Sequence, residues 1–195
     1  MTGALIAFEG RDQRGKETQA RRVRTRLEAA GRHVVQLAFP CYTTTIAHEI
    51  AEALQGRRQY SPELLQLLFV ANRYEYQSKI RDWLAAGAVV LCDRYLASSV
   101  AYGEAQGLDP VWLTDLQRFL VQPHLTILID IAPETAVTRK QTGRDRFERD
   151  LALLGRVRSN YLRLAQTADW ARIDGERSID EVAADVERVI AVRLG

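Results

Sequence analysis

The chain has 195 residues, 47% of them hydrophobic, and a formal net charge of +2, with acidic and basic residues mixed along its length. This length suits one domain of ordinary size, and the charge balance argues against a general nucleic-acid-binding protein. No apolar run approaches the roughly 20 residues of a membrane-spanning helix, and the start lacks the basic segment of a signal peptide. We therefore expect a cytoplasmic protein without a membrane partner, and the two widely spaced cysteines argue against a disulfide framework or a zinc site.

Short apolar stretches alternate with helical patterns along the whole chain. The expected elements are, in order, a strand at Ala4–Phe8, a helix from Gly15 to about Ala30, a strand at His33–Ala38, helices at Thr43–Gln55 and Pro62–Ala86, a strand at Ala88–Cys92, helices at Arg94–Gln106 and Asp109–Val121, a strand at Leu125–Ile131, helices from Pro133 and at Glu148–Thr167, a strand at Trp170–Ile173 and a helix at Ser178–Arg193. This alternation predicts an α/β fold of three layers, in which helices cover both faces of a five-stranded parallel sheet. Ligands of such sheets bind at the carboxyl ends of the strands.

A phosphate-binding loop is predicted where the first strand meets the first helix. Gly10, Gly15 and Lys16 fit the pattern G-x-x-x-x-G-K. Glycines let consecutive backbone N–H groups face an anion, and the helix that follows adds its positive N-terminal end. Lys16 would then reach the outer phosphates of a nucleotide. The alternative is a surface turn with a solvated lysine, but the position between a strand and a helix favours the phosphate loop.

The next residue, Glu17, departs from the Ser or Thr that usually holds magnesium in this loop. A carboxylate could bind magnesium directly or through water, and it would repel the nucleotide phosphates if the metal were absent. Alternatively, Glu17 faces solvent and an acid elsewhere holds the metal. In both cases we expect nucleotide binding to persist with an altered metal dependence.

Several segments together resemble the thymidylate kinases, which are P-loop nucleoside monophosphate kinases. The segments are FEGRDQRGKETQ, LAFPCYTTTIAHEI, LLFVANRYEY, CDRYLASSVAYG, DRFERD and IDGERSIDEV, and they span nearly the whole chain. The resemblance implies the P-loop kinase fold as a single domain over residues 1–195, with a short arginine-rich lid at about 139–149. It also implies a homodimer, for which Leu64, Leu65, Leu68 and Val100 could supply an apolar face.

The activity that the resemblance implies is ATP- and magnesium-dependent phosphorylation of dTMP to dTDP. A nucleotide monophosphate carries about −1.5 to −2 charges at neutral pH and needs no general base to act as a nucleophile. A second hypothesis is a broader nucleoside monophosphate or deoxynucleoside kinase. A third is a catalytically impaired nucleotide-binding relic, because Glu17 and Gln13 depart from the usual loop pattern.

Several residues are expected to bind the acceptor, and two of them share one face of a predicted helix. Phe69 and Arg73 are four apart on a predicted helix and so share a face. An aromatic plane beside a fork of donors suits a pyrimidine, although a core phenylalanine beside a surface arginine is the plainer interpretation. By resemblance, Phe69 stacks on thymine, Arg73 binds its exocyclic oxygen, Arg94 grips the monophosphate and Tyr102 packs under the sugar. The full set of expected acceptor residues is Asp12, Phe39, Pro40, Tyr42, Phe69, Arg73, Arg94, Ser98, Ser99 and Tyr102.

The remaining expected roles concern ATP, the metal and the transferred phosphoryl group. Asp93 ends a buried strand, where an unpaired carboxylate would be costly. It is assigned, with Glu17, to the magnesium network. The alternative interpretation is that Asp93 forms an ion pair with a neighbouring arginine. Asp130 could cap the next helix. The residues expected to bind ATP are Gly10, Arg11, Asp12, Gln13, Arg14, Gly15, Lys16, Glu17, Thr18 and Arg139. The residues expected to act in catalysis are Lys16, Asp93, Arg94, Arg144 and Arg146.

Overall fold

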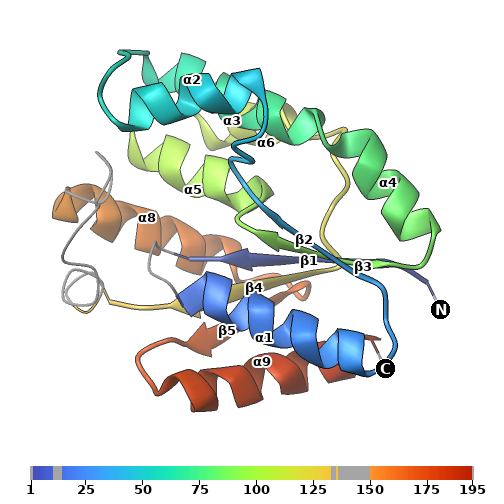
Figure 1. Ribbon diagram of the computed structural model, residues 1–195. Coiled ribbons are helices and arrows are strands. Elements are labelled where there is room, and N and C mark those ends of the chain that lie inside the picture. The colour runs from blue at the N-terminus through green and yellow to red at the C-terminus, as the bar shows by residue number, and fades with distance from the viewer. Residues whose placement is uncertain (1, 11–14, 133–134, 136–149, 195) are drawn as a thin grey trace.

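The computed structural model describes residues 2–10, 15–132, 135 and 150–194. Within them, five strands form one sheet in the order β2-β3-β1-β4-β5, and every neighbouring pair is parallel (Figure 1). The strands are β1 (Ala4–Glu9), β2 (Val34–Ala38), β3 (Val89–Asp93), β4 (Leu125–Asp130) and β5 (Trp170–Asp174). The five-stranded parallel sheet predicted from the alternating pattern is therefore confirmed.

Helices cover both faces of this sheet, as Figure 1 shows. On one face lie α1 (Gly15–Ala29) and α9 (Ile179–Leu194). The other face carries α2 (Thr45–Leu54), α3 (Pro62–Tyr74), α4 (Gln77–Ala85), α5 (Leu96–Ala105), α6 (Pro110–Asp115) and α8 (Leu151–Leu164). None of the described helices combines the length and the apolar sequence needed to cross a membrane.

The alternation of side chains along β1 builds a core on each side of the sheet. Ile6 and Phe8 pack with residues of α1 and α9, whereas Leu5 and Ala7 pack with Ile80 of α4 on the opposite face. All of these side chains are almost completely buried. Each large apolar side chain buried in this way contributes about 1.5–3 kcal/mol to folding. The two-sided burial explains why the strands read as continuous apolar runs.

The long helix expected at Pro62–Ala86 is two helices, with a break at Glu75 and Tyr76. Both residues at the break are tied to the loop before α2. The Glu75 carboxylate accepts hydrogen bonds from Asn72 and Thr44, and the Tyr76 hydroxyl lies 2.7 Å from the hydroxyl of Thr43. The change of direction lets α4 pack against β3 while α3 lies farther from the sheet.

The helix expected at Asp109–Val121 ends at Asp115. Backbone carbonyl groups after that point are taken by side chains from α3 and α4: Tyr74 donates to the carbonyl of Leu116, and Gln77 donates to that of Phe119. A carbonyl held in this way from outside competes with continuation of the helix. Two residues suggested for a dimer face, Leu65 and Val100, are only 0% and 7% exposed and belong to the core of this chain.

Candidate active site

The beginning of the predicted phosphate loop requires glycine at position 10. Gly10 follows β1 with φ of +123°, a conformation that residues with a Cβ rarely adopt. A Cβ there would also lie 2.5 Å from the carbonyl oxygen of Ile129 in the neighbouring strand. After the loop, Gly15 begins α1, so the strand-to-helix context expected of a phosphate loop is present.

Lys16 and Glu17 face different surroundings in the first turn of α1. Lys16 is only 3% exposed, although a solvated lysine was the alternative interpretation. Glu17 is exposed, and Thr18 is half-buried. This exposure fits the alternative in which the Glu17 carboxylate faces solvent. Four loop residues and three lid residues with predicted roles lie outside the described residues: Arg11, Asp12, Gln13, Arg14, Arg139, Arg144 and Arg146.

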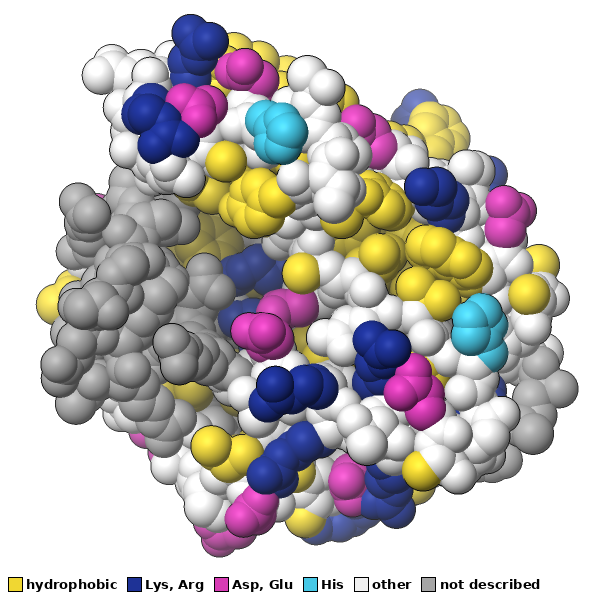
Figure 2. All heavy atoms as spheres, viewed as in Figure 1, with side chains coloured by type: hydrophobic (Ala, Val, Ile, Leu, Met, Phe, Trp, Pro, Cys, Tyr) yellow, Lys and Arg dark blue, Asp and Glu magenta, His cyan; other side chains and the backbone are white. Residues whose placement is uncertain are grey.

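A cavity of about 280 Å³ lies beside the carboxyl ends of β2 and β3, bounded by α3 and α5. Figure 2 shows the hollow, with basic side chains recessed inside it. Every predicted acceptor residue that the structure describes lines this cavity, and Ala38, Leu54, Gln66 and Asp93 complete the wall. Residues from four separate parts of the sequence are thus brought together.

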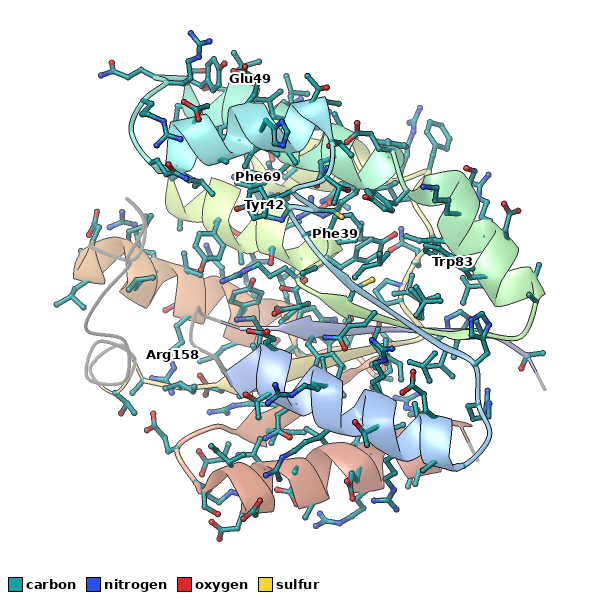
Figure 3. All side chains as sticks on the ribbon, in the orientation of Figure 1. Phe39, Tyr42, Glu49, Phe69, Trp83 and Arg158 are labelled. Atoms are coloured by element: carbon teal, nitrogen blue, oxygen red, sulfur yellow. The ribbon has the colours of Figure 1, made fainter. Side chains whose placement is uncertain are left out.

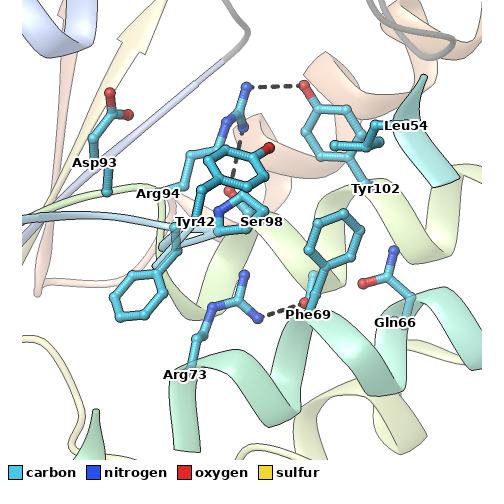
Figure 4. A pocket seen from close by; sticks show the side chains of 13 residues that line it. Tyr42, Leu54, Gln66, Phe69, Arg73, Asp93, Arg94, Ser98 and Tyr102 are labelled. Atoms are coloured by element: carbon cyan, nitrogen blue, oxygen red, sulfur yellow. Dashed lines mark hydrogen bonds between the residues drawn. The ribbon is translucent and has the colours of Figure 1, made fainter. Parts of the chain in front are cut away.

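Phe69 and Arg73 form one end of the cavity, on the face of α3 that points inward (Figure 4). Arg73 is only 3% exposed, which excludes the surface arginine of the plainer interpretation. Its Nη1 atom donates to Ser99 Oγ at 2.7 Å and to Gln117 Oε1 at 3.2 Å. Burial lowers the pKa of Arg73 to about 10, and the negative charge of Glu9 partly opposes this shift. The guanidinium therefore remains protonated at neutral pH.

Arg94 forms the opposite end, and it lies outside the helix in which it was expected. Its φ is +63°, and its N–H donates to the carbonyl of Phe8 in β1 at 2.9 Å, which keeps its backbone out of α5. The guanidinium still reaches the helix, where it donates to Ser98 Oγ and to the Tyr102 hydroxyl, each at 3.3 Å. It also lies 5.2 Å from the centre of the Tyr102 ring. Left-handed conformations at residues other than glycine often mark functional sites.

Asp93 lies beside Arg94 at the end of β3 and lines the same cavity (Figure 4). Its Oδ1 atom is buried and has no hydrogen-bond partner among the described residues. An unpaired carboxylate oxygen at this position fits a hard cation that shares its other ligands with phosphate and water. No group of three or more His, Cys, Asp or Glu side chains in the described part of the chain forms a metal site by itself.

A buried carboxylate beneath the cavity was not predicted from the sequence. Glu9 is completely buried and accepts hydrogen bonds from the Tyr95 N–H at 2.8 Å, from Ser98 Oγ at 2.6 Å and from the Tyr161 hydroxyl at 2.9 Å. Burial, reinforced by the negative charge of Glu9, raises the pKa of Tyr161 well above its ordinary value, so the phenol stays protonated and donates. The only sequence signal was a glutamate directly before Gly10 at the end of a buried strand.

The segment after β2 forms the third wall of the cavity. The Phe39–Pro40 peptide bond is cis. Tyr42 and Phe69 both line the cavity, as does Phe39, whose buried ring packs against Tyr76 and Tyr95. Asn72 of α3 holds this segment in place: its Oδ1 atom accepts from the Cys41 N–H at 2.8 Å, and its Nδ2 atom donates to Thr44 Oγ1 at 3.2 Å. The position of this wall is thereby tied to the helix that carries Phe69 and Arg73.

Asp130 pairs with two arginines, and the helix expected from Pro133, which it could have capped, lies outside the described residues. Its carboxylate accepts hydrogen bonds from Arg158 of α8 and Arg172 of β5, with shortest distances of 2.7 Å (Arg158 is labelled in Figure 3). Burial alone would raise the pKa of Asp130, but the two arginines outweigh burial and hold that pKa below its usual range. Asp130 therefore joins β4, α8 and β5.

Comparison with known proteins agrees with this geometry. A family model described as thymidylate kinase matches residues 8–186. A probable thymidylate kinase from Thermococcus gammatolerans is 37% identical, over 94% of each chain, and a thymidylate kinase from Arabidopsis thaliana is 32% identical, over 96% of this chain and 71% of the relative. The chain belongs to the thymidylate kinase family. The structure of a thymidylate kinase from Candida albicans, 27% identical, covers 98% of this chain and 92% of its own with a TM-score of 0.82.

Family membership covers the whole described site. The matched residues include the end of β1, the predicted phosphate loop, the cavity and the segment predicted as the lid. The close structural similarity to a thymidylate kinase confirms the expected fold class.

Proposed function

We propose that the chain transfers the terminal phosphoryl group of ATP to dTMP and so produces dTDP. One observation carries this proposal: a single cavity has an aromatic ring and a buried arginine at one end and a second arginine beside an unpaired carboxylate at the other. A pyrimidine fits the first end, and its monophosphate fits the second. The end of β1, which leads into Gly10, lies next to the phosphate end, because β1 and β3 are neighbours in the sheet and Phe8 is paired with Asp93.

The chemistry of this transfer consists of positioning and charge neutralisation. The acceptor phosphate is already an anionic nucleophile, so no side chain has to remove a proton. Arg94 would orient that phosphate, and Phe69 and Arg73 would hold the base, so that the attacking oxygen faces the phosphate loop. Lys16 would stabilise negative charge on the transferred group, together with the predicted lid arginines Arg139, Arg144 and Arg146.

Magnesium would share the phosphate charge and orient the phosphates of ATP. Of the two proposed metal residues, Asp93 fits the role better than Glu17, because Asp93 has an unpaired buried oxygen beside the cavity whereas Glu17 is exposed. We also propose a cytoplasmic homodimer. Support for the dimer comes from three partly exposed apolar side chains on α3, namely Leu64, Leu67 and Tyr74.

The decisive experiment is a coupled assay of ADP release with ATP, magnesium and one of four acceptors: dTMP, dUMP, CMP or thymidine. We expect turnover with dTMP to exceed turnover with the other three. Comparable rates with several monophosphates would favour the broader kinase; broad substrate specificity is described for the Candida albicans enzyme. Tight dTMP binding without ADP release would favour a nucleotide-binding relic and would overturn the proposed activity.

A substitution at position 17 tests the metal dependence separately. Glu17 is exposed, and an exposed side chain contributes little to a buried metal site. We therefore expect Glu17→Ser to change turnover at saturating magnesium by less than about threefold. A magnesium titration of the rate for both proteins measures this. A large gain of activity in the variant would mean that the native loop is impaired in holding the metal.

A further inference from the structure

Glu9 lies where β1 meets both phosphate-binding parts of the proposed site. It is the last residue of β1 and directly precedes Gly10, where the predicted phosphate loop begins. In the sheet, Phe8 is paired with Asp93 of β3, the residue before Arg94. Glu9 is completely buried. Its carboxylate can therefore act on a ligand only through the residues that it contacts.

The end of β1 holds the backbone around Arg94. The Arg94 N–H donates to the carbonyl of Phe8 at 2.9 Å, and the next N–H, that of Tyr95, donates to Glu9 Oε1 at 2.8 Å. The same oxygen accepts from the Ser98 N–H at 3.3 Å. Glu9 thus caps α5 from another element, because the N-cap residue Tyr95 makes no side-chain capping bond. These bonds hold Arg94 at φ of +63°, which residues with a Cβ rarely adopt.

Glu9 also determines how the Ser98 hydroxyl faces the Arg94 guanidinium. A serine hydroxyl has a single hydrogen, whereas a carboxylate can only accept. Ser98 Oγ donates to Glu9 Oε2 at 2.6 Å and accepts from Arg94 Nη1 at 3.3 Å (Figure 4 shows the second bond). The Tyr161 hydroxyl lies 2.9 Å from both oxygens and donates to Glu9. The Ser98 hydrogen is therefore engaged by this group of acceptors, and the Ser98 oxygen is left for Arg94.

We propose that Glu9 is a positioning residue that fixes Arg94 for the acceptor phosphate, through the start of α5 and through Ser98. The inference rests on the proposed function, because it takes Arg94 as the residue that holds the monophosphate. Since Glu9 directly precedes Gly10, the same residue also sets Arg94 relative to the beginning of the predicted phosphate loop. Phosphoryl transfer in line depends on this relative position.

The charge of Glu9 has an effect of the opposite sign, which makes the test sharper. A buried negative charge repels a phosphate, so loss of the charge alone would tighten dTMP binding. Glu9→Gln keeps the size of the side chain and an oxygen for the Tyr95 N–H. Its amide nitrogen would donate to Ser98 Oγ and turn the Ser98 hydrogen toward Arg94, so that two donors face each other. We expect this variant to bind dTMP about tenfold more weakly, the effect of losing one hydrogen bond to a charged group.

Thymidine distinguishes positioning of Arg94 from general damage to the cavity. It has the base and sugar of dTMP but no phosphate, so Glu9→Gln should change its affinity by less than about twofold, within the scatter of a lost surface interaction. Calorimetry with dTMP, and competition of thymidine against dTMP, measure the two dissociation constants. Glu49→Gln is the matched control, because the Glu49 carboxylate on α2 also accepts from a tyrosine hydroxyl, that of Tyr60 at 2.6 Å. It should change neither constant.

A double-mutant cycle tests the route through Ser98. Ser98→Ala removes the acceptor of Arg94 without a change of charge and should also weaken dTMP binding about tenfold. In the Ser98→Ala protein, Glu9→Gln should cause no further loss, because the hydroxyl that Glu9 orients is absent. If Glu9→Gln does not fold, Ser98→Ala decides alone. A selective loss of dTMP affinity in that variant supports the inference, and an unchanged ratio of the two affinities overturns it.

NMR of the protein without nucleotide provides a test that does not depend on dTMP. In protein labelled with ¹⁵N at arginine, the Arg94 guanidinium signals, assigned with Arg94→Lys, should shift in Glu9→Gln, and their protons should exchange faster with water. The same signals should stay unchanged in Glu49→Gln. If the wild-type protein bound no dTMP while Arg94 responded to Glu9, the proposed function would fail and the contact between the two residues would stand.

Four results would overturn the inference itself. Unchanged or tighter dTMP binding in Glu9→Gln would mean that charge repulsion outweighs any positioning. Equal losses for dTMP and thymidine would show a structural role for Glu9. Additive losses in the double variant would exclude the route through Ser98. Arg94 signals that did not respond to Glu9→Gln would show that the carboxylate does not fix the guanidinium.

Discussion

At the scale of single residues, Asp130 shows how a charge that would be costly to bury becomes part of the framework. Its side chain is 5% exposed, yet it faces two guanidinium groups that are themselves 33% and 58% exposed. Arg158 and Arg172 can therefore keep some hydration while the carboxylate is neutralised. Such an arrangement avoids much of the penalty of a fully buried ion pair.

Replacing Asp130 with asparagine should lower the free energy of unfolding at pH 7 by about 1–3 kcal/mol, the worth of hydrogen bonds to a charged group. Because the folded state lowers the pKa of Asp130, its contribution is complete above the ordinary pKa of aspartate and is lost as the pH falls through the lower folded value. The difference between the two proteins should therefore shrink below about pH 4.

Urea unfolding of wild type and Asp130→Asn at several pH values between 7 and 3 measures this difference. Thr167→Val is a suitable control, because the Thr167 hydroxyl is exposed and bonds to the equally exposed Asp169. A difference that stayed constant across the pH range would mean that the Asp130 charge does not contribute. The pairing itself could not be predicted from the sequence, because the arginines lie 28 and 42 residues away.

At the scale of elements, close packing between helices depends on a few small residues. Gly103 lies in α5, and a Cβ there would be 2.6 Å from Cδ1 of Leu113 in α6. Gly155 lies in α8, where a Cβ would meet nothing within 4 Å. Both glycines lie within helices but have opposite surroundings, so comparing them distinguishes the effect of packing from that of helix propensity.

Gly103→Ala should destabilise the protein by about 1–3 kcal/mol, because the completely buried Leu113 must move to admit the methyl group. Gly155→Ala should stabilise it by about 0.5–1 kcal/mol, since alanine favours the helix and no neighbour resists it. Thermal and urea unfolding of both variants measure the two effects. Destabilisation of similar size in both would show that α5 and α6 are not packed against each other at Gly103.

The sequence predicted the elements better than it predicted their ends. The apolar runs around Leu5 and Ile127 mark buried strands because parallel strands are covered on both faces. The ends of α3 and α6 depend instead on hydrogen bonds from Thr44 and Gln77, residues distant in the sequence. Such bonds leave no periodic pattern, so helices predicted from periodicity alone run too far.

At the scale of the whole molecule, the site contains some residue contacts that helical spacing predicts and others that depend on how distant elements pack. Phe69 and Arg73 share a face because α3 is regular, so their pairing followed from the sequence. Glu9 and Tyr161 meet only because α8 packs near the end of β1, a contact between residues 152 apart.

The outer face of α3 leads to a prediction about assembly. Leu64, Leu67 and Tyr74 are 43%, 41% and 37% exposed and lie within one sector of the helix. A twofold dimer would bury this stripe against the same stripe of a second copy, provided that about 800 Å² per chain is covered. Of the four residues first suggested from the sequence, only Leu64 belongs to this stripe, because Leu65 and Val100 face the core and Leu68 is half-buried.

Leu67→Glu should therefore convert a dimer into a monomer. Twofold symmetry brings each substitution into the interface twice, so two desolvated carboxylates would weaken association by at least about tenfold. Sedimentation velocity at several protein concentrations measures the change. Val192→Glu is the matched control, because Val192 is 80% exposed on α9, across the sheet from α3. A wild-type protein that sediments as a monomer at micromolar concentration would contradict the prediction. A dimer unaffected by Leu67→Glu would place the interface elsewhere.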